Sequence, residues 1–201
     1  MWKKHEITFF FFTFALPNTI CSGMNKIQIK DKHFELFISE EVLKKEIDRI
    51  ADKLNETLKD KNPVFVVVLT GAFMFASEII KRFQWNCEVT FMRLKSYKGT
   101  NSAGIVRELH GFVEKIESRN VVILEDIIET GKTMDYLIRK LNEQNPASIQ
   151  IASLFFKPKA LKKEIRPDYV ACEIGNDFIV GFGLDYDGFG RNLNCIYKIK
   201  E

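Results

Sequence analysis

The sequence predicts an α/β fold, in which a twisted parallel sheet is flanked by helices. Strand-like apolar runs alternate with segments of helical periodicity, which is typical of parallel strands joined by crossover helices. The clearest runs, Val64–Leu69 and Val121–Leu124, are continuously apolar, as expected of strands that are buried on both faces. With 201 residues, of which 46% are hydrophobic, the chain is long enough to bury a sizeable core.

The expected elements begin at residue 39. Ser39 is a suitable N-cap, and Glu40 and Glu41 suit the positive end of a helix dipole. Apolar residues then recur at helical spacing until about Leu58. The further expected helices are Ala72–Phe83 and Met134–Gln144. β-branched and aromatic runs predict the strands, which are Val64–Leu69, Glu88–Arg93, Val121–Leu124, Ser148–Phe156, Tyr169–Ile174 and Phe178–Phe182.

Polar segments separate these elements. Asp60–Pro63 is an expected turn, and Lys95–Gly104 is polar and contains glycine, which predicts a mobile loop. Ile105–His110 and Val113–Glu117 are expected to pair as a hairpin around Gly111.

Residues 1–23 differ from the rest of the chain. Lys3 and Lys4 precede the apolar segment Ile7–Leu16, and small residues follow at Cys21–Gly23, which is the layout of a signal peptide. The alternative is that translation starts at Met24, and we favour it because the remaining sequence is typical of an intracellular protein. We therefore expect residues 1–23 to be a disordered extension or absent from the mature protein, and residues 24–201 to form one domain.

Composition excludes several functional classes. The net charge is only +3, and lysine and arginine are dispersed, which does not favour nucleic-acid binding. The four cysteines lie far apart, so neither a disulfide framework nor a zinc site is expected. No apolar run reaches the length of a membrane-spanning helix.

The stretch Val121–Thr133 combines the features of a ligand site. In open α/β sheets ligands bind beyond the carboxyl ends of strands, and free N–H groups at a helix start bind phosphate. Here the apolar strand is followed by the acids Glu125 and Asp126, and then by Glu129, Thr130, Gly131, Lys132 and Thr133.

A Walker A loop does not fit this stretch. That loop requires glycine five residues before the glycine of its Gly-Lys pair, and Asp126 occupies this position. Two carboxylates repel phosphate but accept hydrogen bonds from a vicinal diol, so ribose 5-phosphate suits the stretch better. The alternative, an ordinary strand-to-helix turn with solvated acids, leaves the order of strand, acid pair and Thr-Gly-Lys-Thr unexplained.

The stretch closely resembles the phosphoribosyl-pyrophosphate (PRPP) signature of type I phosphoribosyltransferases. The order and spacing of Leu69–Ile79, Arg93–Tyr97, Lys157 and Asp177–Leu193 extend this resemblance to hypoxanthine-guanine phosphoribosyltransferases. The resemblance implies the type I fold with a small hood formed by terminal segments. It also implies a cytoplasmic, Mg²⁺-dependent enzyme of purine salvage, which transfers the phosphoribosyl group from PRPP to hypoxanthine or guanine and releases pyrophosphate and IMP or GMP. Such enzymes form homodimers or homotetramers, and no nucleic-acid or membrane partner is implied.

For PRPP, the resemblance implies individual roles. Glu125 and Asp126 would hold the ribose hydroxyls beside Mg²⁺. The loop Glu129–Thr133 would wrap the 5′-phosphate with its backbone N–H groups and the hydroxyls of Thr130 and Thr133. The other implied PRPP contacts are Thr70, Gly71 and Arg191 at the pyrophosphate, Gly131 and Lys132 in the phosphate loop, and Ser96 and Tyr97 in a loop that closes over the site.

For the purine, the resemblance implies a second group of residues. Glu129 would be the base facing purine N7, and Lys157 would donate to the 6-oxo group. Phe178 would stack on the ring, and the backbone of Ile179 would pair with its edge. Asp185 would ligate a second Mg²⁺ next to the purine site. A lysine donor rejects a 6-amino group, which favours hypoxanthine and guanine over adenine.

Three positions depart from the family pattern. Glu129 stands where the family usually has aspartate, so the base reaches one methylene further, and Thr70 and Asp177 stand where relatives often have lysine. Two alternatives remain open: a xanthine-preferring phosphoribosyltransferase, and a regulator on the same fold that binds PRPP or nucleotide. The regulator would require a clustered basic face, which dispersed charges do not supply.

Overall fold

In the part of the chain that the structure describes, the main sheet has six strands, of which five are parallel. The structure, a computed structural model, describes residues 24–96, 106–110 and 115–200. The predictions for residues 1–23 and for 97–104 lie outside these ranges. From one edge to the other, the strands are β5 (Val106–His110), β4 (Glu88–Ser96), β3 (Val64–Leu69), β6 (Asn120–Ile128), β7 (Ser148–Phe156) and β8 (Tyr169–Glu173). Only β5 runs antiparallel to its neighbour. The predicted parallel sheet is confirmed.

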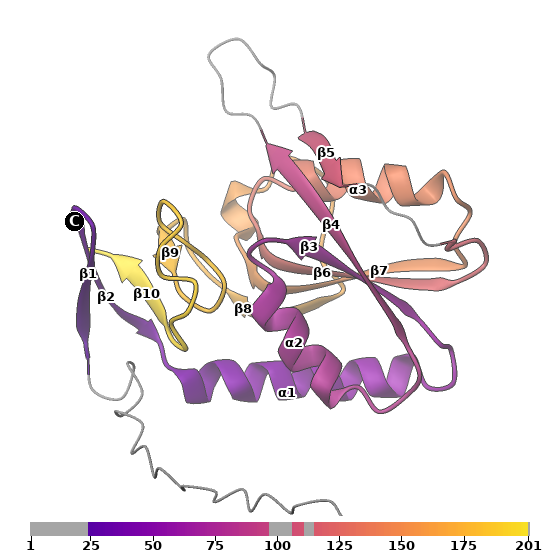
Figure 1. Ribbon diagram of the computed structural model, residues 1–201, viewed down its shortest axis with the longest axis horizontal. Coiled ribbons are helices and arrows are strands. Elements are labelled where there is room, and N and C mark those ends of the chain that lie inside the picture. Colours follow the sequence, from indigo (N-terminus) through magenta and orange to yellow (C-terminus); the bar gives the residue numbers. More distant parts are fainter. Residues whose placement is uncertain (1–23, 97–105, 111–114, 201) are drawn as a thin grey trace, which may run out of the picture.

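Helices cover both faces of this sheet, as Figure 1 shows. On one face α1 (Glu40–Thr57) and α2 (Phe73–Arg82) pack against alternate strand residues such as Phe65 and Val67. On the other face α3 (Lys132–Asn142) packs against Val64 and Val66. Because both faces are covered, the strands need apolar residues at every position, which explains the continuous runs in the sequence.

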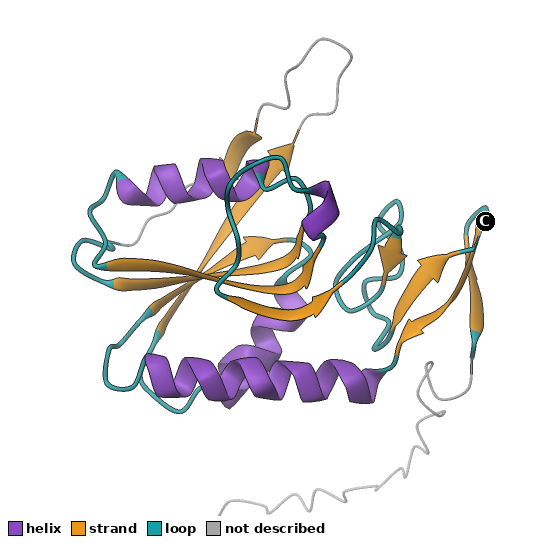
Figure 2. Cartoon of the chain, turned by 180° about the vertical axis from the view of Figure 1, so that it is seen from behind, coloured by secondary structure: helices purple, strands orange, loops and turns teal. Residues whose placement is uncertain are grey.

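Four further strands of the described chain form a separate antiparallel sheet beside the main one (Figures 1 and 2), and we call this sheet the hood. Its strands are β1 (Lys26–Ile29), β2 (Lys32–Ile38), β10 (Ile196–Ile199) and β9 (Ile179–Val180), in the order in which they pair. The hood contains strands from both ends of the described chain, and these strands pack around a small hydrophobic core that includes Phe34, Leu193 and Tyr197. The hood implied by the family resemblance is therefore present.

Several local predictions need correction. β5 pairs antiparallel with β4, which was not predicted. Of the predicted hairpin between Ile105–His110 and Val113–Glu117, residues 105 and 111–114 lie outside the described residues, and residues 115–117 are not in a strand. The strand predicted at Phe178–Phe182 is only Ile179–Val180, and it belongs to the hood. Helix α3 begins at Lys132, two residues before the predicted start, and β4 extends to Ser96, into the predicted loop. These boundaries depend on backbone hydrogen bonds, which the periodicity of the side chains does not predict.

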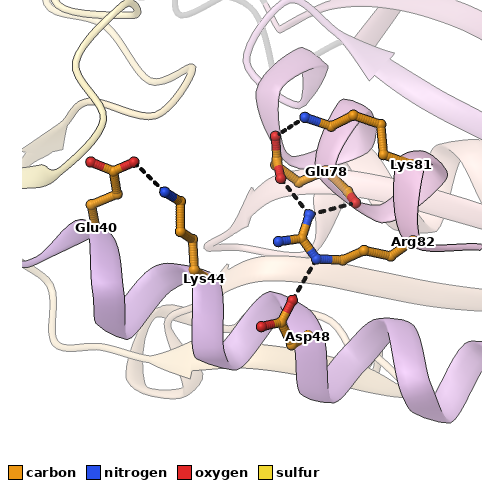
Figure 3. Close-up of polar contacts among 6 residues, drawn as sticks. All are labelled: Glu40, Lys44, Asp48, Glu78, Lys81 and Arg82. Carbon is orange, nitrogen blue, oxygen red and sulfur yellow. Dashed lines mark hydrogen bonds and ion pairs between the residues drawn. The ribbon is translucent and has the colours of Figure 1, made fainter.

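An ionic network joins α1 to α2 (Figure 3). Arg82 pairs with Asp48 of α1 and with Glu78 of its own helix, and Lys81 also contacts Glu78. Burial raises the pKa of Glu78, but the hydrogen bonds from Lys81 and Arg82 outweigh it, and the pKa is lowered. The network helps to fix α2, whose first turn follows the end of β3, where the site lies.

Among the described residues no helix is both long and apolar enough to cross a membrane.

Candidate active site

A cavity of about 550 Å³ opens at the carboxyl ends of β3, β4 and β6. Seven residues predicted for the site line it: Thr70, Gly71, Glu125, Asp126, Thr133, Asp185 and Arg191. Three further residues, Val68, Leu69 and Leu94, line the cavity and were not predicted for the site. Their apolar side chains resemble those of any buried strand, so only their position at strand ends could have indicated them.

The acid pair Glu125 and Asp126 lines the cavity. Glu125 is 7% exposed, and its Oε2 atom has no hydrogen-bond partner among the described residues. Asp126 Oδ1 accepts a hydrogen bond of 2.8 Å from the backbone N–H of Ile127. Burial, together with the charge of Asp126, raises the pKa of Glu125 well above its ordinary value. Burial also raises the pKa of Asp126, although its hydrogen bonds and the charge of Arg191 oppose that effect. The pair therefore suits a ligand that brings hydroxyl donors or a cation.

Glycines let three backbone segments meet beside this pair. A Cβ atom at Gly71 would lie 1.5 Å from Oδ2 of Asp126. A Cβ atom at Gly183, whose φ is +100°, would lie 2.0 Å from the carbonyl oxygen of Gly71. The end of β3, the end of β6 and the loop after β9 are thus in contact through positions that only glycine fits. Gly183 was not predicted as a site residue, although it lies in the Gly-Phe-Gly sequence of the matched motif.

The loop after β9 supplies the cationic wall of the cavity. Arg191 Nη2 forms an ion pair of 2.6 Å with Asp185 Oδ1, and Arg191 Nη1 donates to the carbonyl oxygen of Gly183 at 2.6 Å. The other Asp185 oxygen accepts from the backbone N–H of Gly188 at 2.7 Å. These bonds fix both side chains, so the guanidinium faces the cavity in a defined position.

The start of α3 forms the opposite wall. Gly131 precedes the helix with a φ of 75°, and no side chain forms a capping hydrogen bond there. The hydroxyl of Thr130 is 3.5 Å from the backbone nitrogen of Lys132, which is at the limit of a hydrogen bond. The N–H groups of the first turn therefore remain able to bind an anion, next to Thr133 in the cavity lining. The side chain of Lys132 is exposed to solvent.

Two predicted purine contacts, Glu129 and Lys157, lie at the ends of β6 and β7, outside the lining of this cavity. The ammonium group of Lys157 is bound by the carboxylate of Glu129 in an ion pair. The side chain of Lys157 is buried, whereas that of Glu129 is half exposed. The fold thus brings the predicted base and the predicted 6-oxo donor into direct contact.

The remaining predicted residues belong to the hood or to the end of β4. Phe178 is 44% exposed, and its ring packs against those of Phe34 and Tyr186 at centroid distances of 6.4 and 5.9 Å. Ile179 is buried in β9. Ser96 ends β4, and Tyr97 lies outside the described residues.

Comparisons with known proteins agree with this geometry. Residues 39–187 match the model of the phosphoribosyl transferase domain. The hypoxanthine-guanine phosphoribosyltransferase of Streptococcus thermophilus is 40% identical over 173 residues, which is 86% of this chain and 96% of that protein. The Streptococcus pyogenes enzyme of the same name is 38% identical over 83% of this chain and 93% of its own length. A crystal structure of a Staphylococcus aureus hypoxanthine phosphoribosyltransferase superposes with a TM-score of 0.79 at 35% identity, covering 83% of this chain and 91% of that chain.

Proposed function

Because the chain belongs to the hypoxanthine-guanine phosphoribosyltransferase family, we propose that it transfers the 5-phosphoribosyl group of PRPP to hypoxanthine or guanine in purine salvage. One observation carries this proposal: the Glu125–Asp126 pair, of which Glu125 is buried, the open start of α3 and the guanidinium of Arg191 surround one cavity. PRPP carries a sugar diol, a 5′-phosphate and a pyrophosphate, and these groups suit the acid pair, the helix start and the guanidinium, respectively.

PRPP binds across the cavity. The first-turn N–H groups of α3 and the hydroxyls of Thr130 and Thr133 hold the 5′-phosphate, because a helix start combines free donors with a positive dipole end. Glu125 and Asp126 accept hydrogen bonds from the ribose hydroxyls. Arg191, with the backbone of Thr70 and Gly71, binds the pyrophosphate.

The donor set of the acid pair fits Mg²⁺. Glu125 and Asp126 supply oxygen atoms, and Glu125 Oε2 is buried without a partner among the described residues. Those residues contain no group of three or more histidine, cysteine, aspartate or glutamate side chains around a common point, but Mg²⁺ commonly takes only one or two carboxylates plus substrate oxygens. When bound, Mg²⁺ would neutralise the charge of the departing pyrophosphate. Asp185 would hold a second ion, directly or through water.

The reaction is a substitution at the anomeric carbon. A purine ring nitrogen forms the new bond to this carbon, the bond to the pyrophosphate oxygen breaks, and its electron pair leaves with pyrophosphate. Glu125 and Asp126 stabilise the positive charge that develops on the sugar. Glu129 accepts the proton that the purine loses.

Purine recognition lies between Lys157 and the hood. The Lys157 ammonium has three hydrogens, so it donates to a 6-oxo group while retaining its contact with Glu129. A 6-amino group would place donor against donor, which disfavours adenine. Phe178 stacks on the ring, and the backbone of Ile179 pairs with its edge. Ser96, the last residue of β4, and its neighbour Tyr97 would contact PRPP and help to exclude water from the reaction. We place the enzyme in the cytoplasm, as a homodimer or homotetramer, because PRPP is a charged intracellular substrate and the family assembles in this way.

The test uses purified protein with PRPP and Mg²⁺, to which hypoxanthine, guanine, xanthine and adenine are offered separately, and follows nucleotide formation by absorbance. We expect turnover of hypoxanthine and guanine, none of adenine, and loss of all turnover when a chelator removes Mg²⁺. Preferential turnover of xanthine would overturn the substrate assignment. PRPP binding without turnover of any base would overturn the enzyme assignment in favour of a regulator.

A further inference from the structure

Two turns from opposite ends of the chain are docked on each other in the hood. One is the turn Lys30–Asp31 between β1 and β2, and the other spans Tyr186–Phe189. The hydroxyl of Tyr186 donates to Oδ1 of Asp31 at 2.9 Å, across 155 residues of sequence. Lys30 Nζ lies 3.2 Å from Asp187 Oδ2 and 5.1 Å from the centre of the Phe189 ring. The side chains of Lys30 and Asp31, in the turn between β1 and β2, thus hold the turn Tyr186–Phe189 in place.

The second turn is tight and carries part of the proposed site. Tyr186 and Phe189 exchange backbone hydrogen bonds of 2.9 and 3.0 Å. Asp187 and Gly188 between them have φ values of 50° and 85°, as in the tight turns that join antiparallel strands. The N–H of Gly188 also binds Asp185, which precedes Tyr186 and lines the cavity. A shift of Tyr186 would therefore shift Asp185.

The ring of Tyr186 connects this turn to the proposed purine platform. It meets the Phe178 ring edge-on, at a centroid distance of 5.9 Å and an angle of 84°. It also packs at 6.1 Å against Phe34, which is fully buried. The exposed Phe178 ring is thus supported by a tyrosine whose far end is fixed by Asp31. The hydrogen bond also lowers the pKa of Asp31 and raises that of Tyr186.

We propose that Tyr186, held by Asp31, is a positioning residue for the purine. It fixes the orientation of the Phe178 ring relative to the turn that contains Asp185. This inference rests on the proposed function, in which Phe178 stacks on the purine. Neither Tyr186 nor Asp31 touches a reacting atom. Their effect is on the affinity for the base and the nucleotide, since a ring that is free to tilt loses part of its stacking contact.

The test compares four variants: Tyr186→Phe, Asp31→Ala, the double variant, and Asp31→Asn, whose amide oxygen can still accept from the hydroxyl. We expect each of the first two to raise the KM for hypoxanthine and the Kd for IMP about three- to tenfold, the scale of one hydrogen bond. The kcat should stay within about twofold of wild type. The double variant should be no worse than either single variant, because both remove the same bond. Asp31→Asn should retain wild-type affinity.

A matched control is Glu35→Ala. It removes another surface ion pair of the hood, between Glu35 and Lys198 at 3.3 Å, which includes no residue of the turn Tyr186–Phe189. We expect this variant to keep the wild-type KM. Unchanged affinity in Tyr186→Phe, additive effects in the double variant, or an equal effect of Glu35→Ala would overturn the inference. Binding of IMP, measured by calorimetry, keeps the test independent of turnover: wild-type protein that binds IMP but converts no base refutes the proposed function alone.

Discussion

Replacement of Gly71 by alanine places a methyl group inside the space of the Asp126 carboxylate. The added Cβ would lie 1.5 Å from Oδ2 and 2.5 Å from Cγ of Asp126, whereas real Cβ atoms essentially never approach a heavy atom within 3.0 Å. The distance between the new Cβ atom and Oδ2 of Asp126 must therefore increase by at least 1.5 Å. If Asp126 rotates away, it breaks the hydrogen bond that its other oxygen accepts from the N–H of Ile127, and its carboxylate leaves its place in the cavity lining.

The displacement gives an expected magnitude. A misplacement of about 1 Å at a reacting centre costs on the order of a hundredfold in rate. We therefore expect Gly71→Ala to lower kcat/KM for PRPP at least about a hundredfold, which corresponds to roughly 2.7 kcal/mol of lost transition-state stabilisation. The assay is steady-state kinetics with hypoxanthine, accompanied by circular dichroism and thermal unfolding to show that the variant remains folded.

Gly175→Ala is the matched control for this prediction. A Cβ atom at Gly175 meets only Oδ2 of Asp177, at 3.0 Å, and that oxygen is at the end of a side chain. We expect this variant to keep wild-type kcat/KM within about twofold. A folded Gly71→Ala protein whose kcat/KM stays within tenfold of wild type would refute the reasoning, because it would show that Asp126 can move without affecting catalysis.

Other perturbations have defined outcomes. The double variant Glu125→Ala with Asp126→Ala should abolish turnover but keep or raise the melting temperature, because it removes a buried carboxyl oxygen that has no partner among the described residues, and full activity would contradict the site assignment. Glu129→Ala should lower kcat more than it raises the KM for PRPP, and an unchanged kcat would mean that Glu129 is no base. The folded-state pKa of Glu78 is lowered, so its stabilisation is present above its ordinary pKa of 4.5 and is lost as the pH falls through the lowered value. Denaturant unfolding should therefore show the wild type losing its advantage over Glu78→Gln below about pH 4.5, and a pH-independent difference would contradict this sign. Burial and, to a lesser extent, the charge of a neighbouring acid raise the pKa of Cys172 to about 11. Alkylation of this thiol at pH 8, followed by mass spectrometry, should therefore be roughly a hundredfold slower than that of an ordinary thiol. Labelling at the ordinary rate would show that the thiol is not shielded.

Local sequence patterns predicted the centre of the fold. The continuous apolar runs of β3 and β6 identified strands that are buried on both faces, and Ser39 does cap α1, since its side chain accepts from the N–H of Val42. The order of strand, acid pair and helix start also placed Glu125 and Asp126 at the carboxyl end of a central strand. These features are readable because caps and periodicity act within a few residues of each other.

The hood could not be derived in the same way. Strands β1, β9 and β10 are only two to four residues long, which is too short for a clear periodic pattern. The resemblance to a known family, and not the pattern of residues, indicated that the terminal segments would form this unit. The pairing of β5 with β4 was missed for a related reason, because the choice of a strand partner depends on backbone hydrogen bonds between distant segments.

The sequence by itself determined the fold class, the position of the acid pair at a strand end, and the chemistry that such a pair suits. Tertiary structure alone decided which residues meet: Lys157 with Glu129, Gly71 with Asp126, and Tyr186 with Asp31. The physical reason is range. Periodicity and capping reflect interactions between neighbours in the chain, whereas an ion pair, a close backbone approach or a docked turn depends on where the packed core brings separate segments together.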